Sequence, residues 1–164
     1  MTMQSSLFNS AVLTVVALLS IGNVQAEELL DSRMEAFLVE NHEGRESLHA
    51  ASVAEPGNIL EYQLTYTSRA TKPLAMQYIS VPVSPNTVYL KGSASVSATS
   101  EFQVSLDGGK TWSSEPVKQQ IKDKEGKLQE VVVPESEYTN LRWHEKSDIA
   151  PGAVKQYHYR VKVL

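Results

Sequence analysis

The chain of 164 residues has the length of one ordinary domain, and its hydrophobic content of 41% is sufficient for a packed core. Its net charge of -4 makes it a poor electrostatic partner for nucleic acid or anionic lipid. Cysteine is absent, which excludes disulfides, thiol catalysis, zinc–thiolate sites and a lipid anchor on cysteine.

The first 26 residues have the pattern of a helical signal peptide. The apolar run 11–21 has the length of a signal-peptide core and is shorter than the ~20 residues that a transmembrane helix needs. Val24 and Ala26 place small residues where signal peptidase reads the chain, so we expect cleavage after Ala26. An uncleaved N-terminal membrane anchor is the alternative. After cleavage, residues 27–164 are expected as one exported domain, periplasmic or extracellular, without further membrane insertion.

Residues 59–67 organise the remaining chain, because their side chains alternate in polarity with a period of two. This pattern predicts a strand that is buried on one face only. The side chains expected on the buried face are those of Leu60, Tyr62, Leu64 and Tyr66. The last strand, from Tyr157, repeats the pattern.

Further extended segments follow one another between turn signals. In chain order, the expected strands cover residues 37–39, 47–53, 59–67, 74–83, 87–90, 102–106, 128–133, 138–143 and 157–163. A short helix is the alternative before residue 39. Residues 93–100 are a loop or a flat edge strand. The turn at residues 107–110 leads into a return strand at Thr111, and residues 121–127 form an exposed hairpin turn.

This spacing, about eight to ten short strands with turns at roughly 8–12-residue intervals, is typical of an all-β sandwich. Three blocks within residues 53–164 resemble the bacterial immunoglobulin-like conserved-repeat family, catalogued as domain of unknown function 11. The first block is Pro56-Gly57 with Leu60-Glu61-Tyr62 and Thr65-Tyr66-Thr67. The second is Val81-Pro82-Val83 through Thr87-Val88-Tyr89 to Gly92-Ser93-Ala94. The third is Leu141-Arg142-Trp143 with Ile149-Ala150-Pro151-Gly152 and residues 159–163. The resemblance implies an immunoglobulin-like antiparallel sandwich outside the cytoplasm, in a family mostly without assigned activity.

One segment resembles the Asp-box hairpin of sialidases and other propellers. The matching residues are Ser105, Asp107, Gly109, Thr111 and Trp112. An aspartate in such a turn accepts backbone N–H bonds, and glycine permits positive φ. We therefore expect a structural turn here, because a propeller needs at least about four blades of four strands and this chain is too short for one.

Candidate catalytic or ligand-binding residues are scarce. The four histidines, His42, His49, His144 and His158, lack metal-site spacing, and His144 with Glu145 and Asp148 forms at most a weak metal site. No G-x-S-x-G motif occurs. We expect no catalytic, cofactor-binding or metal-binding residues.

The sequence thus predicts an exported, non-enzymatic immunoglobulin-like domain of the bacterial envelope, with a binding or structural role and another envelope protein as its partner. A periplasmic chaperone or adaptor that acts by strand addition is one alternative, with residues 93–100 as the candidate edge. A carbohydrate-active hydrolase is the other, suggested only by the Asp-box-like hairpin.

Overall fold

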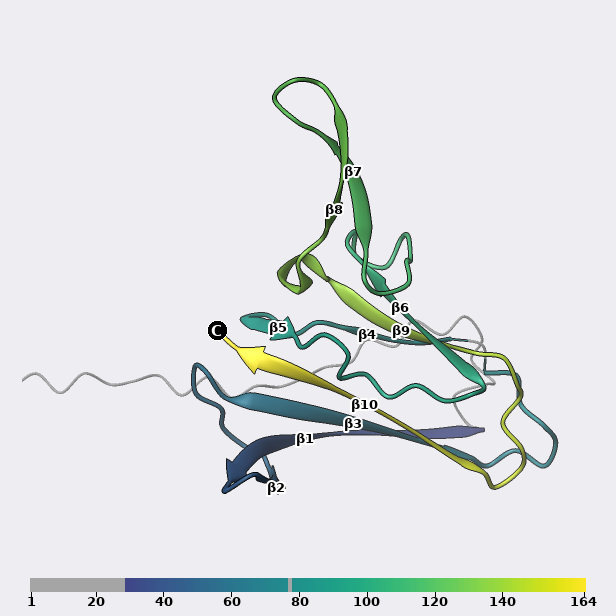
Figure 1. The fold of residues 1–164 in the computed structure, drawn as a ribbon. Coiled ribbons are helices and arrows are strands. Elements are labelled where there is room, and N and C mark those ends of the chain that lie inside the picture. The colour runs from purple at the N-terminus through teal and green to yellow at the C-terminus, as the bar shows by residue number, and fades with distance from the viewer. Residues whose placement is uncertain (1–28, 77) are drawn as a thin grey trace, which may run out of the picture.

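A computed structural model describes residues 29–76 and 78–164 (Figure 1). The expected signal peptide and its cleavage after Ala26 lie outside the described residues. The described chain is all-β, with one short 3-10 turn, η1 (Glu135–Glu137). Its strands are β1 (Leu30–His42), β2 (Arg45–Ala50), β3 (Ile59–Ser68), β4 (Tyr78–Pro82), β5 (Thr87–Tyr89), β6 (Ser100–Ser105), β7 (Lys118–Lys122), β8 (Leu128–Val132), β9 (Asn140–Glu145) and β10 (Val154–Val163).

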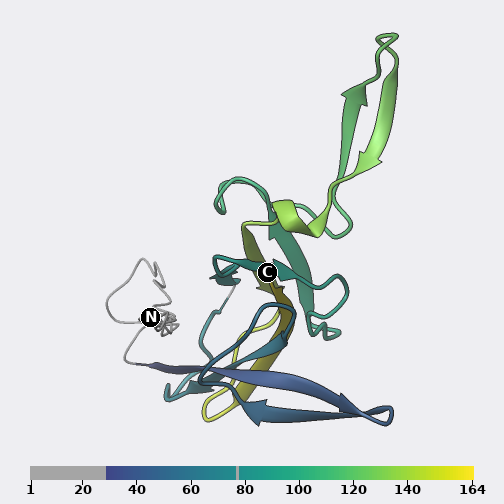
Figure 2. The same ribbon diagram turned by 90° about the vertical axis from the view of Figure 1, so that its left-hand side faces the viewer.

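The strands form two antiparallel sheets and a separate two-stranded ribbon. One sheet has the order β2-β1-β3-β10-β5, and the other has the order β4-β9-β6. Strands β7 and β8 pair only with each other, and the ribbon they form projects from the sheets (Figures 1 and 2). In the part of the chain that the structure describes, no helix has the length and apolar character needed to span a bilayer.

Strand β3 lies at the centre of the larger sheet, and its alternation is the one predicted. Its inward side chains are all at most 5% exposed: Leu60, Tyr62, Leu64 and Tyr66. The neighbouring strand β10 buries Tyr157, Tyr159 and Val161 in the same way. The rings of Tyr62 and Tyr159 stack with centroids 5.2 Å apart, so aromatic pairs join the two strands on their buried face.

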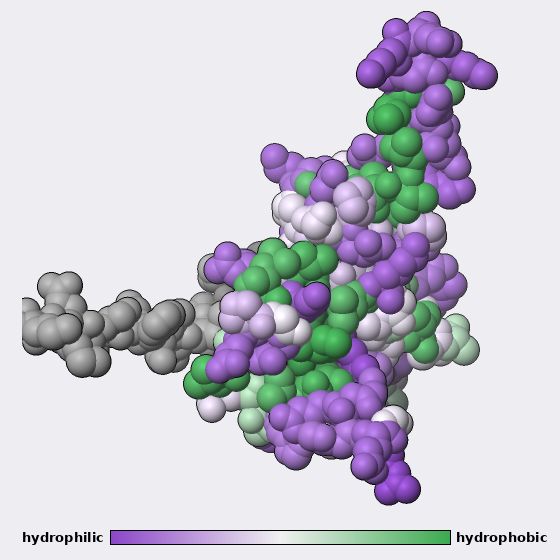
Figure 3. All heavy atoms as spheres, turned by 60° about the vertical axis from the view of Figure 1, so that its left-hand side comes forward, coloured by the Kyte–Doolittle hydropathy of each residue, from purple (hydrophilic) through white to green (hydrophobic). Residues whose placement is uncertain are grey.

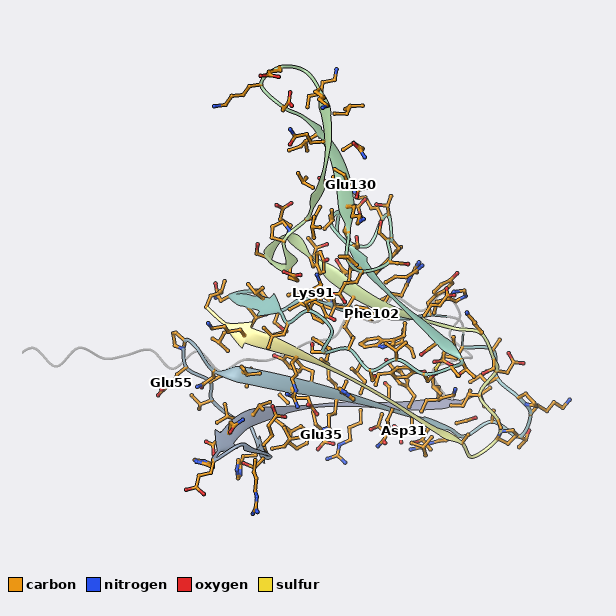
Figure 4. The ribbon with its side chains drawn as sticks, viewed as in Figure 1. Asp31, Glu35, Glu55, Lys91, Phe102 and Glu130 are labelled. Atoms are coloured by element: carbon orange, nitrogen blue, oxygen red, sulfur yellow. The ribbon has the colours of Figure 1, made fainter. Side chains whose placement is uncertain are left out.

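The two sheets pack face to face around Trp143 of β9, which is 0% exposed. Its ring lies 5.3 Å from Tyr157 and 6.1 Å from Tyr159, both on β10 of the opposite sheet. Phe102 of β6 lies 5.4 Å from Trp143 within the smaller sheet, and its ring also lies 5.7 Å from that of Tyr89 on β5 of the larger sheet (Figure 4). The predicted all-β architecture of packed antiparallel sheets is therefore confirmed.

The strand expected at residues 37–39 is confirmed and is longer than expected, because β1 begins already at Leu30, which excludes the helical alternative. The return strand expected at Thr111 is wrong: only an isolated bridge joins Val104 and Ser113, and Pro116 then lacks the N–H that a continuing ladder needs. Of the two alternatives for residues 93–100, residues 93–99 form the loop. Ser95 N–H donates to His158 C=O at 2.8 Å, and the hydroxyls of Ser95 and Ser93 accept the N–H groups of His158 and Arg160.

Glu61 departs from the simple alternation, because it lies on the polar side of β3 yet is only 5% exposed. Arg160 of β10 explains this burial. Its Nε donates to Glu61 at 2.9 Å, and its terminal nitrogens donate to both oxygens of Glu46 on β2. Since β1 and β3 lie between β2 and β10 in the sheet order, the sheet must curl to bring these side chains together.

We predict that Arg160→Met lowers the free energy of unfolding by about 2 kcal/mol, because Glu61 then keeps a buried carboxylate without its charged partner. Urea denaturation measures this loss. Glu46→Gln is the matched control and loses far less, since Glu46 is half-exposed. Equal losses in the two variants would contradict the assignment of Glu61 as the residue that depends on Arg160.

Candidate functional site

The Asp-box-like segment forms a turn closed by its own side chains. Asp107 Oδ1 accepts hydrogen bonds from the backbone N–H groups of Lys110 at 3.0 Å and Thr111 at 2.9 Å. Its Oδ2 accepts the Thr111 hydroxyl at 2.6 Å, and Ser105 Oγ accepts Gly109 N–H at 2.9 Å. The Thr111 hydroxyl and N–H are the main reason that the pKa of Asp107 lies well below its usual value. The carboxylate of Asp107 is thus engaged inside the turn.

Gly109 adopts a positive φ beside the indole of Trp112. It has φ of 86°, and a Cβ at this position would lie 3.4 Å from Trp112 Cζ2. The turn therefore brings Trp112 back over the outer face of the smaller sheet, where Arg142 meets it.

A row of stacked side chains covers that outer face, drawn from three segments that are distant in sequence. The guanidinium of Arg142 on β9 lies 4.2 Å from the ring of Trp112 and 4.5 Å from that of Tyr78 on β4. Tyr78 also stacks on His144 at 4.7 Å, and Gln103 of β6 accepts a hydrogen bond from Arg142 Nε at 3.0 Å. Because these side chains stack on one another, the row joins β4, β9 and the turn.

We predict that Arg142→Lys lowers the free energy of unfolding by about 1 kcal/mol, because lysine keeps the charge but loses the planar stacking surface. The emission of Trp112 should shift to the red, while that of the buried Trp143 should not. Arg33→Lys, at a side chain that is 72% exposed, is the control. Identical stabilities of the two variants would contradict a structural role for the row.

The histidines do not gather into a metal site. His144 and Glu145 are consecutive in β9, so their side chains leave opposite faces of the sheet. The weak site considered for His144, Glu145 and Asp148 therefore does not form. Within residues 29–76 and 78–164, no group of three His, Cys, Asp or Glu side chains is placed to hold a metal ion.

The β7–β8 ribbon contributes little to the packing of the two sheets. At its base, Val117 and Val133 are buried and joined by a hydrogen bond from Val133 N–H to Val117 C=O of 2.9 Å. At its tip, Asp123 Oδ1 accepts the N–H groups of Glu125 and Lys127, both at 2.9 Å. The predicted exposed turn at residues 121–127 is confirmed, and the ribbon is ordered at both ends.

Between its base and its tip, the ribbon exposes apolar side chains to solvent. Ile121 is 46%, Leu128 is 60% and Val132 is 52% exposed, and Figure 3 shows hydrophobic atoms along the ribbon below its polar tip. Lys118 and Glu130 form an ion pair of 2.8 Å on the face of the ribbon that carries Leu128 and Val132, while Ile121 lies on the other face. An isolated two-stranded hairpin is marginally stable in water, so an exposed apolar ribbon of this kind is a surface suited to a partner.

The outer edges of the ribbon also carry free backbone groups. Val133 N–H donates to Val117 C=O across the two strands, and hydrogen-bonded positions alternate along an antiparallel ladder. The register Lys118↔Val132 then turns the N–H and C=O groups of Leu128, Glu130 and Val132 outward on β8. On β7, the same alternation turns the N–H and C=O groups of Lys118, Gln120 and Lys122 outward. The sequence predicted a strand at residues 128–133 but not its exposure, because an apolar, β-branched segment has the same pattern in a core. It did not predict β7, since Ile121 and Lys122 belong to the expected turn.

Comparison with known proteins adds no relative from which a role for these surfaces could be transferred: no family model, curated protein or solved structure matches the chain.

Proposed function

We propose that this chain is an exported, non-enzymatic immunoglobulin-like domain that binds another protein of the bacterial envelope through its β7–β8 ribbon. The expected signal peptide supports export. The three family-like blocks fall on β3, on β4 and β5, and on β9 and β10, which are strands of the two packed sheets. The observation that carries the proposal is the ribbon itself, which projects from the sandwich with Ile121, Leu128 and Val132 exposed.

The ribbon contributes little to the stability of the sandwich when nothing covers it. Its side chains are exposed at nearly every position of β7 and β8, so it adds little to the core. Burying exposed apolar side chains stabilises a complex by roughly 25 cal/mol per Å² of apolar surface, before the cost of association. Ordered ends lower that cost, because a partner meets a preformed surface. A protein partner with an apolar groove fits this surface better than a nucleic acid or a charged lipid headgroup does.

Strand addition is the second candidate mode, and the outward backbone of β8 favours it. Lys118 and Lys122 protect the edge of β7, since lysines on an edge disfavour pairing with another strand. On β8 the outward residues are Leu128, Glu130 and Val132, with no lysine among them. An extended partner segment would therefore pair with β8. Residues 93–99, the edge considered from sequence, follow β10 as a loop.

A site-specific photo-crosslinker at Leu128 tests the proposal in intact envelopes. We expect one discrete crosslinked partner, and none when the same group is placed at Lys72, an exposed loop position on the sandwich.

Two substitutions then test whether the ribbon holds that partner. Ile121→Lys and Leu128→Lys should each weaken binding at least about tenfold without lowering stability, because both side chains are already exposed. Val53→Lys makes the same chemical change at a side chain that is 68% exposed outside the ribbon, and it should leave binding intact. Equal binding by all three variants would reject the ribbon as the contact surface.

A further inference from the structure

A polar pocket of about 250 Å³ lies where the loop before β6, the end of β9 and the start of β10 meet. Serine and threonine hydroxyls from residues 95–100 form one wall, and Lys155, Gln156 and Tyr157 form another. Glu145 lies at its base. The volume is below the roughly 300–1,000 Å³ of pockets for drug-sized ligands, so the pocket suits a small molecule.

Glu145 is a buried carboxylate in this pocket, with a side chain only 1% exposed. Its Oε1 accepts the Tyr157 hydroxyl at 2.8 Å, and its Oε2 accepts Lys155 Nζ at 3.0 Å. Burial, together with the bond to Glu145, raises the pKa of Tyr157 above its ordinary value, so the phenol remains a donor. Lys155 provides the positive charge opposite Glu145, and its side chain is 27% exposed.

The backbone of Gln156 adds a free donor and acceptor on the same side. His158 N–H donates to Ser95 Oγ at 3.0 Å and Arg160 N–H to Ser93 Oγ at 2.9 Å, so alternate residues of β10 face the loop rather than β3. By this alternation, Gln156 N–H and C=O face the pocket. Among the described residues, neither group has a hydrogen-bond partner there.

We propose that this pocket binds a free α-amino acid with a small polar side chain. The ligand ammonium pairs with Glu145, and the ligand carboxylate pairs with Lys155 and the Gln156 N–H. Binding exchanges the internal Glu145–Lys155 ion pair for two ion pairs with a zwitterion, so each buried or half-buried charge keeps an opposite charge beside it.

The lining selects this class of ligand over others. An isolated ammonium or carboxylate ion would leave one member of the Glu145–Lys155 pair without a counter-charge, which is costly near a buried group. The hydroxyls of Ser97 and Thr99 bond one another at 3.1 Å, and Thr99 also donates to Glu145 at 3.5 Å, so a polar ligand side chain would exchange hydrogen bonds with this pair. Val96 is the pocket's one aliphatic wall residue and is 66% exposed, so a large apolar side chain gains little there.

Titration of the folded protein with L-serine, followed by amide NMR shifts, tests the proposal. We expect saturable shifts at Ser97 and Gln156 with a dissociation constant of about 1 mM, and none on the β7–β8 ribbon. N-acetyl-L-serine and L-serine amide each remove one ligand charge and should bind at least about tenfold more weakly. Because the measured amide shifts belong to residues of the pocket, a pocket that does not bind L-serine is distinguished from a ribbon that does not bind a protein.

Glu145→Gln and Lys155→Met should each weaken L-serine binding at least about tenfold, while Lys162→Met, an exposed lysine on the same strand, should not. Should either variant fail to fold, the two blocked forms of L-serine decide the question in the native protein, because they remove a ligand charge and leave the chain unchanged. Absence of saturable shifts in the native protein at tenfold higher concentrations, or equal binding of L-serine and both blocked forms, would overturn the proposal.

Discussion

The pairing of β3 with β10 is the constraint on which the rest of the structure depends. Nine consecutive residue pairs join these strands, from Val154↔Thr67 to Lys162↔Ile59. On one side, Tyr62 and Tyr159 stack and meet Trp143 of the opposite sheet. On the other side, Arg160 binds Glu61 and reaches Glu46, which ties the curled β1–β2 edge to the centre. One strand pair therefore sets both the packing of the two layers and the curvature of the larger sheet.

The two proposed binding surfaces lie where the β3–β10 pairing ends and where the chain leaves the core. The pocket forms at the start of β10, where the loop before β6 covers only part of the strand edge and Glu145 faces inward from β9. It holds one carboxylate, rather than the facing pair that glycoside hydrolysis requires. The ribbon forms beyond the buried pair Val117 and Val133, where the chain leaves the core. The sandwich supports both surfaces without depending on either.

The sequence was sufficient to predict features that depend on local alternation. The buried faces of β3 and β10 follow from a period of two in leucine, tyrosine and valine, and the tip of the ribbon follows from a charged turn with Gly126. The stacked row of Trp112, Arg142 and Tyr78 depends on the register of strands far apart in the chain, which no local pattern contains. Glu145 could have been found, because Leu141 and Trp143 precede it on the same face of β9.

The most direct test of this account is the stability of a variant in which residues 118–132 are replaced by an Asn-Gly turn. Because Val133 N–H donates to Val117 C=O across the base of the ribbon, a two-residue turn joins these residues without disturbing the sandwich. Urea denaturation should give a free energy of unfolding within about 1 kcal/mol of that of the intact chain, since the ribbon's side chains are largely exposed. A loss of several kcal/mol would contradict a core that is complete without the ribbon.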